Sequence, residues 1–227
     1  MIIITGITGG IGNYLFHAFK EAGEHVLGTF HQNIPAEKGY EECHALDVTN
    51  YQEVEKFIQH HQSSFVNLTL INCAGVTHSS FAHKTNVDDW NHVINVNLNG
   101  PFNMIRSVLP IMREQNYGRI INLSSIVGQT GVMGTSAYAA SKAGLNGMIK
   151  SIALENAQKG VTINNINLGY FNVGMINTVP VEMQDKIKDK IAYKEFGDPQ
   201  NIFNTIQYIR DTPYLTGSCI DLNGGLV

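Results

Sequence analysis

The stretch Ile2-Ile3-Ile4-Thr5-Gly6-Ile7-Thr8-Gly9-Gly10-Ile11-Gly12 decides the fold, because it predicts a strand, a glycine-rich turn and the start of a helix. The β-branched run at its beginning is typical of a fully buried strand. Apolar residues then recur at helical spacing as far as Ala22, and Gly23 suits the position after a helix. The glycines allow a close approach of the backbone to a pyrophosphate, and the helix N-terminus supplies free N–H groups. The stretch therefore predicts a phosphate-binding turn.

Strands and helices alternate through the rest of the chain. Such alternation implies parallel strands joined by right-handed crossovers, so we expect one Rossmann-like, doubly wound α/β domain over residues 1–227. Pro35, Gly39 and several polar residues interrupt residues 29–42, where the crossover helix is predicted to be short or missing. Further strands are predicted at residues 25–29, 42–46, 68–72, 119–123, 161–167 and 218–222, and helices at about 87–113, 137–158 and 199–209.

Composition narrows the class of protein. The 227 residues are 43% hydrophobic and 15% charged, as in soluble globular domains, and the net charge of −4 offers no basic surface for nucleic acid. The first strand begins too early to follow a signal peptide, and no apolar run reaches the ~20 residues of a membrane span. Three widely spaced cysteines indicate reduced thiols in the cytoplasm. We expect no metal site, because the scattered histidines lack matching ligands.

A second motif brings acid–base groups together. Tyr138 and Lys142 are four residues apart, which places them on one face of a helix. A free phenol ionises near pH ~10, and a lysine cation nearby is expected to lower that pKa. Ser125 follows a predicted strand, where its hydroxyl can bind the same substrate oxygen as the phenol. Taken alone, the spacing equally fits a buried tyrosine beside a surface lysine.

The two motifs together resemble the short-chain dehydrogenase/reductase family in its small single-domain form, and its 3-oxoacyl-carrier-protein reductases in particular. The family's glycine signature is matched by Thr5, Gly6, Gly10, Ile11 and Gly12. Further matches follow in order along nearly the whole chain. They are Asp47-Val48, Asn72-Cys73-Ala74-Gly75 (with Cys73 where the family has a second Asn), Asn97, Gly197-Asp198-Pro199, Leu215-Thr216-Gly217 and Asp221-Leu222-Asn223-Gly224-Gly225.

The resemblance implies an NAD(P)(H)-dependent oxidoreductase that interconverts a ketone and a secondary alcohol. Its catalytic residues would be Asn97, Ser125, Tyr138 and Lys142, with Tyr138 as proton donor and Asn97 holding a water that connects Lys142 to solvent. Leu168-Gly169 replaces the family's Pro-Gly, and Val173 replaces a threonine that contacts the nicotinamide. The implied cofactor-binding residues are Gly6, Thr8, Gly10, Ile11, Gly12, Thr29, His31, Asp47, Val48, Asn72, Ala74, Gly75, Tyr138, Lys142, Gly169 and Val173.

The residues after the second predicted strand favour NADP(H) over NAD(H). An NAD site places a carboxylate there to bind the ribose 2′-hydroxyl, and none occurs from His25 to Ala36. Thr29, His31 and Gln32 can instead donate hydrogen bonds to a 2′-phosphate. The segment contains no Arg or Lys, and Gly9 stands where NADP-using relatives often carry a basic residue. The preference is therefore predicted to be modest.

The substrate is less well specified. Residues 76–81, 128–135 and 172–193 are expected to surround it, and 172–193 is interpreted either as an apolar substrate lid or as an ordinary helix pair. A 3-oxoacyl thioester is the favoured substrate, although Asn116 replaces one of two basic residues that face the acyl carrier in related enzymes, leaving Lys159. The resemblance also implies a homotetramer or homodimer. Two alternatives remain: a non-catalytic dinucleotide sensor, and a sugar-nucleotide enzyme, which would need a further C-terminal domain.

Overall fold

Seven parallel strands form one sheet, in the order β3-β2-β1-β4-β5-β6-β7. The computed structural model describes residues 1–32, 39–40 and 43–226. Most of the strands are buried along their whole length, because β-branched and leucine side chains fill both faces. The strands are β1 (Ile2–Thr5), β2 (Val26–Phe30), β3 (Cys43–Ala45), β4 (Thr69–Asn72), β5 (Gly118–Ser125), β6 (Val161–Leu168) and β7 (Cys219–Leu222).

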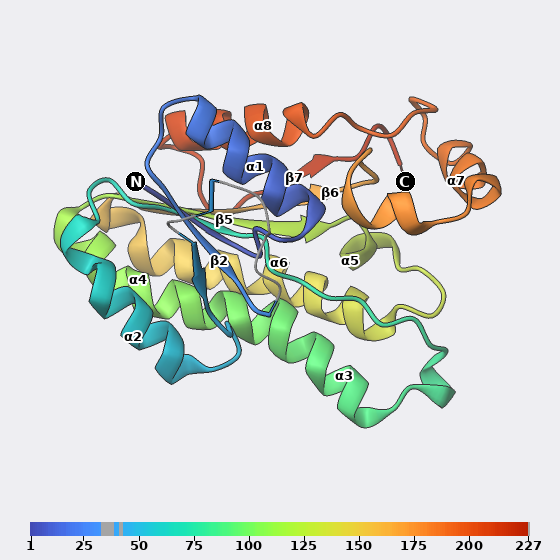
Figure 1. The fold of residues 1–227 in the computed structure, drawn as a ribbon, viewed down its shortest axis with the longest axis horizontal. Helices are drawn as coiled ribbons and strands as arrows, with labels where there is room; N and C mark the ends of the chain where they lie inside the picture. The colour runs from blue at the N-terminus through green and yellow to red at the C-terminus, as the bar shows by residue number, and fades with distance from the viewer. Residues whose placement is uncertain (33–38, 41–42, 227) are drawn as a thin grey trace.

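Helices cover both faces of the sheet, as Figure 1 shows. One face carries α1 (Gly10–Glu21) and α8 (Gln200–Asp211), packed through Ile4, Phe16 and Ile206. The other carries α2 (Tyr51–His61), α4 (Gly100–Gln115) and α6 (Ser136–Asn156). Shorter elements are α3 (Val87–Ile94), α5 (Val127–Thr130), α7 (Val181–Lys188), a π-helical segment η3 (Asn95–Asn99) and the 3-10 turns η1 (Gln62–Ser64), η2 (Ala82–Lys84), η4 (Ala157–Lys159) and η5 (Gly174–Thr178).

The predicted α/β fold is confirmed, and the predicted strands all occur with ends that agree within two residues. The helix predicted at 87–113 is instead α3, η3 and α4 in succession. Helix α2 was not predicted, although Val54, Phe57 and Ile58 form its buried stripe. The short or missing helix predicted within 29–42 falls largely outside the described residues.

The first helix ends as its sequence indicates. Gly23 has a φ of 79° and its N–H donates to the Lys20 carbonyl, while the Glu24 N–H donates to the Phe19 carbonyl. These two bonds form a Schellman motif, which satisfies carbonyls that the end of α1 leaves without helical partners. The close of α1 therefore follows from a glycine that tolerates the left-handed conformation.

The strand order reverses between β1 and β4, where crossovers leave the sheet in opposite directions. Parallel α/β sheets bind ligands at the carboxyl ends of their strands beside such a switch point. The loops after β1 to β6 meet at this edge and carry part of the predicted site, while Asn97 comes from η3 and Tyr138 and Lys142 come from α6.

Candidate active site

The glycine turn after β1 is shaped by close backbone contacts. A Cβ at Gly6 would lie 2.7 Å from the Ala74 Cα, and the φ of Gly6 is 73°. A Cβ at Gly12 would lie 2.3 Å from the Gly6 carbonyl oxygen. The Thr5 hydroxyl accepts hydrogen bonds from the Cys73 and Ala74 N–H groups, which ties the ends of β1 and β4 together. These positions exclude side chains, so the turn can approach a pyrophosphate closely.

Two cavities open on opposite sides of this turn. The first, of about 340 Å³, lies over the carboxyl ends of β5 and β6, and we call it the reaction cavity. The second, of about 400 Å³, lies over the ends of β2 and β3, and we call it the adenosine cavity. The reaction cavity contains Gly10, Ile11, Gly12, Ser125, Tyr138, Lys142, Gly169 and Val173. The adenosine cavity contains Gly6, Thr8, Thr29, His31, Asp47, Val48 and Ala74, and Gly75 belongs to both.

Ser125, Tyr138 and Lys142 meet in the reaction cavity. Ser125 ends β5, where its hydroxyl donates to the Leu168 carbonyl and accepts from the Val127 N–H, and α6 brings the Tyr138 side chain over this strand end into the same cavity. The Lys142 ammonium lies 5.5 Å from the centre of the Tyr138 ring. Lys142 is buried and donates a 2.8 Å hydrogen bond to the Leu123 carbonyl. Helical spacing and the strand end thus bring the three groups together.

The sequence predicted a lowered pKa for Tyr138, and this prediction is wrong for the arrangement in the structure. Burial raises the pKa of the Tyr138 phenol, while the hydrogen bond from Ser125 opposes that effect. Burial also lowers the pKa of Lys142 to about 8, with a smaller opposite effect of the Cys73 thiol. The Cys73 pKa is raised to about 12, chiefly by burial. Spacing alone could not show that desolvation would dominate the pKa of this phenol.

Asn97 lies next to the reaction cavity without lining it. Its carboxamide is fully engaged: Nδ2 donates to the Val76 carbonyl and the Ser141 hydroxyl, and Oδ1 accepts from the Val76 N–H. Asn97 sits within the π-helical segment η3, and π-helical turns displace backbone carbonyls from the regular ladder. The side chain therefore anchors the loop after β4 to η3 and α6.

Asn72 also lies outside both cavities. Its Nδ2 donates to Asn122 Oδ1, Asn122 Nδ2 donates to Asn165 Oδ1, and Asn165 Nδ2 donates to Asn146 Oδ1. These four side chains form an amide ladder that crosses β4, β5 and β6 and ends on α6. The structure thus places Asn72 in the interior of the sheet instead of against a cofactor.

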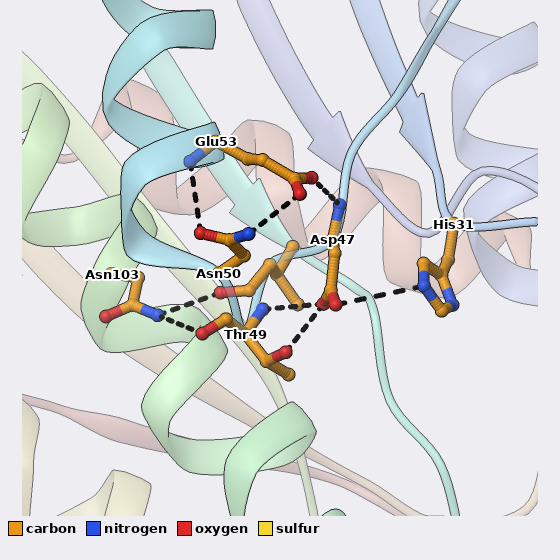
Figure 2. A network of polar contacts seen from close by, with 7 residues as sticks. His31, Asp47, Thr49, Asn50, Glu53 and Asn103 are labelled. Atoms are coloured by element: carbon orange, nitrogen blue, oxygen red, sulfur yellow. Dashed lines mark hydrogen bonds and ion pairs between the residues drawn. The ribbon is translucent and has the colours of Figure 1, made fainter.

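Charged groups of the adenosine cavity sit at its rim. Asp47 follows β3, and its Oδ2 lies 3.9 Å from His31 Nε2, which follows β2 (Figure 2). The segment after β2 lacks a carboxylate as far as it is described, but Asp47 brings one to the same place from the neighbouring strand. Sequence reasoning assigned Asp47 to cofactor binding and missed this pairing.

Other cavity residues could not be read from the sequence. Cys73, where the family pattern has asparagine, lines both cavities. His92 and Val96 reach the adenosine cavity from α3 and η3. Further apolar or hydroxyl residues line the reaction cavity. The three segments expected around the substrate contribute Val76, Thr77, Val132, Thr135, Val173, Ile176 and Val179. Other segments, which were not predicted, contribute Ile126, Val127, Tyr170 and Phe171.

The segment 172–193 begins as a wall of the reaction cavity and ends away from it. Val173 and Ile176 line the cavity, and a Cβ at Gly10 would lie 2.3 Å from the Gly174 Cα. The Gln184 amide donates to the Ile176 and Val179 carbonyls, which fastens α7 to η5. None of the residues of α7 is buried, so α7 is not an ordinary core helix. Whether this segment acts as a lid stays a prediction.

The two cavities match the two ends of a dinucleotide. The first intrahelical bond of α1 runs from the Asn13 N–H to the Gly9 carbonyl, so the preceding N–H groups have no helical partner and face the turn. A pyrophosphate fits there because no Cβ intervenes at Gly10 or Gly12. A phenol, a hydroxyl and an ammonium then stand at one end of the site. This combination of fold and site defines an oxidoreductase that uses a bound dinucleotide.

Comparison with known proteins gives the family. The model of the short chain dehydrogenase family matches residues 1–184, and the chain belongs to that family. The acetoacetyl-CoA reductase of Shinella zoogloeoides is 35% identical, covering 98% of this chain and 96% of that protein. The 3-oxoacyl-acyl-carrier-protein reductase FabG of Staphylococcus epidermidis is 33% identical, covering 99% and 97%. Nodulation protein G of Azospirillum brasilense is 32% identical, covering 99% and 96%. The expected family is confirmed, and the chain is an oxidoreductase of carbonyl and alcohol groups.

No helix in the described part of the chain is long and apolar enough to span a membrane.

Within the same residues, no group of three or more His, Cys, Asp and Glu side chains is placed to hold a metal ion. His44, His60 and His61 do form a ring cluster between β3 and α2, with ring centres less than 5 Å apart for His44–His61 (4.6 Å) and His60–His61 (4.8 Å). Burial and the neighbouring rings lower the pKa of His61.

Proposed function

We propose that this protein is an NADP(H)-dependent reductase of 3-oxoacyl thioesters, which converts the 3-keto group into a secondary alcohol. The observation that carries the proposal is the meeting of Ser125, Tyr138 and Lys142 at the floor of an otherwise apolar cavity. The three groups serve one carbonyl oxygen: two can hydrogen-bond to it, and the third supplies positive charge beside them.

Each group has a distinct part in the proposed reaction. Tyr138 donates its proton to the oxygen of the carbonyl as negative charge develops there, and Ser125 hydrogen-bonds the same oxygen. The burial that raises the pKa of Tyr138 keeps the phenol protonated before reaction. Lys142 stabilises the phenolate left behind and binds the ribose hydroxyls of the cofactor. Asn97, within the π-helical segment η3, holds a water that connects Lys142 to solvent.

The nicotinamide cofactor, when bound, supplies the hydride. Gly6, Gly10 and Gly12 make room for its pyrophosphate, and the residues of the adenosine cavity hold its adenosine. A modest preference for NADP(H) is supported by the donors Thr29 and His31 at the rim. It is limited by the Asp47 carboxylate beside them, because a 2′-phosphate would lie close to a like charge.

The lining of the reaction cavity supports a neutral acyl group as substrate. Apart from Lys142, its described lining contains no charged side chain, and Val127, Val132 and Val179 form its walls. A free carboxylate would be desolvated there without a partner, whereas a short acyl chain would bury apolar surface. The relatives named acetoacetyl-CoA reductase and 3-oxoacyl-acyl-carrier-protein reductase agree with this class.

The remaining expectations concern the carrier, the assembly and the compartment. Lys159 lies at the surface beside Asn116, since Gly160 packs directly on the Asn116 carbonyl, so one basic residue remains for an acidic carrier. We further propose a cytoplasmic homodimer or homotetramer, supported by exposed apolar side chains such as Phe102 on α4 and Leu154 on α6. Light scattering that gives a mass near 25 kDa at micromolar concentration would contradict the assembly.

The proposal is tested by turnover of acetoacetyl-CoA, an acetoacetyl carrier protein and unrelated ketones with NADPH. We expect Tyr138→Phe to lower kcat by about a hundredfold or more while cofactor affinity changes little, because only the transferable proton is lost. Tyr214→Phe is the matched control, since Tyr214 is 101% exposed and lines neither cavity. Near-normal turnover of the Tyr138→Phe variant would remove Tyr138 as the proton donor.

A further inference from the structure

The Asp47 carboxylate, which lines the adenosine cavity, is held by a network of polar contacts that Figure 2 shows. Its Oδ1 accepts hydrogen bonds from the Thr49 N–H at 2.9 Å and the Thr49 hydroxyl at 2.7 Å. Asn50 caps α2 by accepting from the Glu53 N–H, and Asn103 on α4 donates to the Val48 carbonyl. These bonds fix the loop between β3 and α2, so that Oδ2 remains directed toward His31.

His31 faces this fixed charge from a more exposed position. Its side chain is 59% exposed and that of Asp47 is 36% exposed, and Nε2 lies 3.9 Å from Oδ2. Neither strand end carries a guanidinium or ammonium among its described residues, so the His31 imidazole is the cation available to a phosphate at these strand ends. Histidine changes its charge between pH 5 and 8, unlike the other donors Thr8 and Thr29.

The other titratable groups near this pair are few. Glu53 on α2 accepts a 3.4 Å hydrogen bond from the Asp47 N–H, and His92 lines the cavity from α3. No further charged side chain lines the described part of this cavity. Glu37, Lys38, Glu41 and Glu42 belong to the segment outside the described residues, and the test below includes Lys38 for that reason.

We propose that His31 and Asp47 together make the choice between NADP(H) and NAD(H) depend on pH. When His31 is protonated, the pair is neutral overall and presents a cationic donor to the 2′-phosphate. When His31 is neutral, the pair carries the single negative charge of Asp47, which repels a phosphate and accepts a hydrogen bond from a 2′-hydroxyl. The preference for NADP(H) therefore falls as pH rises through the titration of His31. This inference rests on the proposed dinucleotide function and adds the residues that set its selectivity.

The direction of this pH dependence distinguishes it from the effect of ionisation of the cofactor's own 2′-phosphate. A 2′-phosphate gains negative charge as pH rises past ~6, which would strengthen its binding to a permanent cation. A loss of NADPH affinity over the same range has two sources: a protein group that loses positive charge, or repulsion between Asp47 and the more highly charged phosphate. The His31→Gln variant separates them, because it keeps Asp47 and removes the titrating cation.

The experiment measures dissociation constants of NADPH and NADH at pH 6.0 and pH 8.5, by fluorescence and without any substrate. We expect the ratio of NADPH to NADH affinity to fall about tenfold between these pH values in the unmodified protein, the size of one charge–charge contact at a half-exposed site. His31→Gln keeps a donor without a titrating charge and should show a low, nearly constant ratio. His31→Arg should show a high ratio that does not fall with pH.

His83→Gln is the matched control, because His83 lines neither cavity, and it should keep the pH dependence of the unmodified protein. Lys38→Ala and His92→Gln test the two other cationic candidates, and both should also keep that pH dependence. A constant ratio in the unmodified protein, or a falling ratio that survives in His31→Gln, overturns the inference. Because the assay needs no substrate, failure to reduce a 3-oxoacyl thioester would count against the proposed reaction alone. Failure to bind either dinucleotide would overturn both proposals.

Discussion

The reaction cavity and the adenosine cavity share Gly9, Cys73, Gly75 and Val76, yet their charged side chains differ in exposure to solvent. In the reaction cavity Lys142 is buried, and burial lowers its pKa to about 8. In the adenosine cavity the charged pair is 59% and 36% exposed. A buried charge interacts strongly with its nearest partner, whereas the interactions of an exposed charge depend on solvent and pH. The comparison teaches that one glycine turn can lie between a cavity with a buried charge and a cavity with an exposed charged pair.

The largest effect should come from removing the buried charge of the reaction cavity. We expect Lys142→Met to lower kcat/KM by about a hundredfold or more, because the phenolate loses its stabilising cation. The same change should raise the free energy of unfolding at pH 7 by about 2 kcal/mol, since a pKa lowered from 10.5 to about 8 marks a costly buried charge. Part of that gain is offset by the Leu123 carbonyl, which loses its donor.

The pH dependence of this stability difference gives a second measurement. Below pH 8 both folded and unfolded chains carry the Lys142 proton, so the full cost is present. Above about pH 8 the folded protein releases that proton and gains stability relative to the variant as pH approaches 10. Thermal unfolding at pH 7 and pH 9.5 tests this, with exposed Lys150→Met on the same helix as control. A variant less stable than the parent at pH 7 would show that Lys142 stabilises the fold.

A moderate effect is expected where the two cavities meet. Gly9 has a φ of −79°, and a Cβ there would contact only the Gly6 carbonyl oxygen at 3.4 Å, so a side chain is tolerated. Gly9→Arg should raise NADPH affinity about tenfold and leave NADH affinity nearly unchanged, because a guanidinium binds phosphate in bidentate fashion. Gly9→Ala controls for the loss of glycine. Equal gains for both cofactors would indicate contact with the pyrophosphate instead.

The smallest effect concerns Val173, which stands where the family has a threonine. Valine and threonine share a shape, and Val173 lines the reaction cavity beside Gly10. Val173→Thr should raise the affinity for the nicotinamide cofactor by roughly threefold, the size of a weak additional hydrogen bond. Cofactor titration measures it, with Val132→Thr on another wall of the cavity as control. No gain would mean that backbone groups already satisfy the carboxamide.

The sequence predicted the strands well because each is an apolar run that the sheet buries, as at Ile2–Thr5. It missed α2, although the pair Asn50 and Glu53 forms a capping signal that could have located the start of that helix. It also could not foresee the π-helical turn inside 87–113, since nothing in the local pattern distinguishes that turn from a continuous helix.

In the site, local spacing predicted that Ser125, Tyr138 and Lys142 lie together, but two physical properties of the site could not be predicted from it. One is burial, which reverses the expected shift of the Tyr138 pKa. The other is contact between distant segments, which pairs His31 with Asp47 and brings His92 to the same cavity. Both properties depend on how strand ends converge, and no single segment of sequence contains that information.

The amide ladder of Asn72, Asn122, Asn165 and Asn146 has a consequence for folding. The first three face one another in register across β4, β5 and β6. If one strand slipped by a single residue, its amide would turn to the opposite face and leave its neighbours buried without partners, at about 1–3 kcal/mol for each. Apolar strands by themselves tolerate such errors, since one isoleucine packs much like the next. The ladder therefore specifies one alignment of β4, β5 and β6 beneath the edge that carries the two cavities.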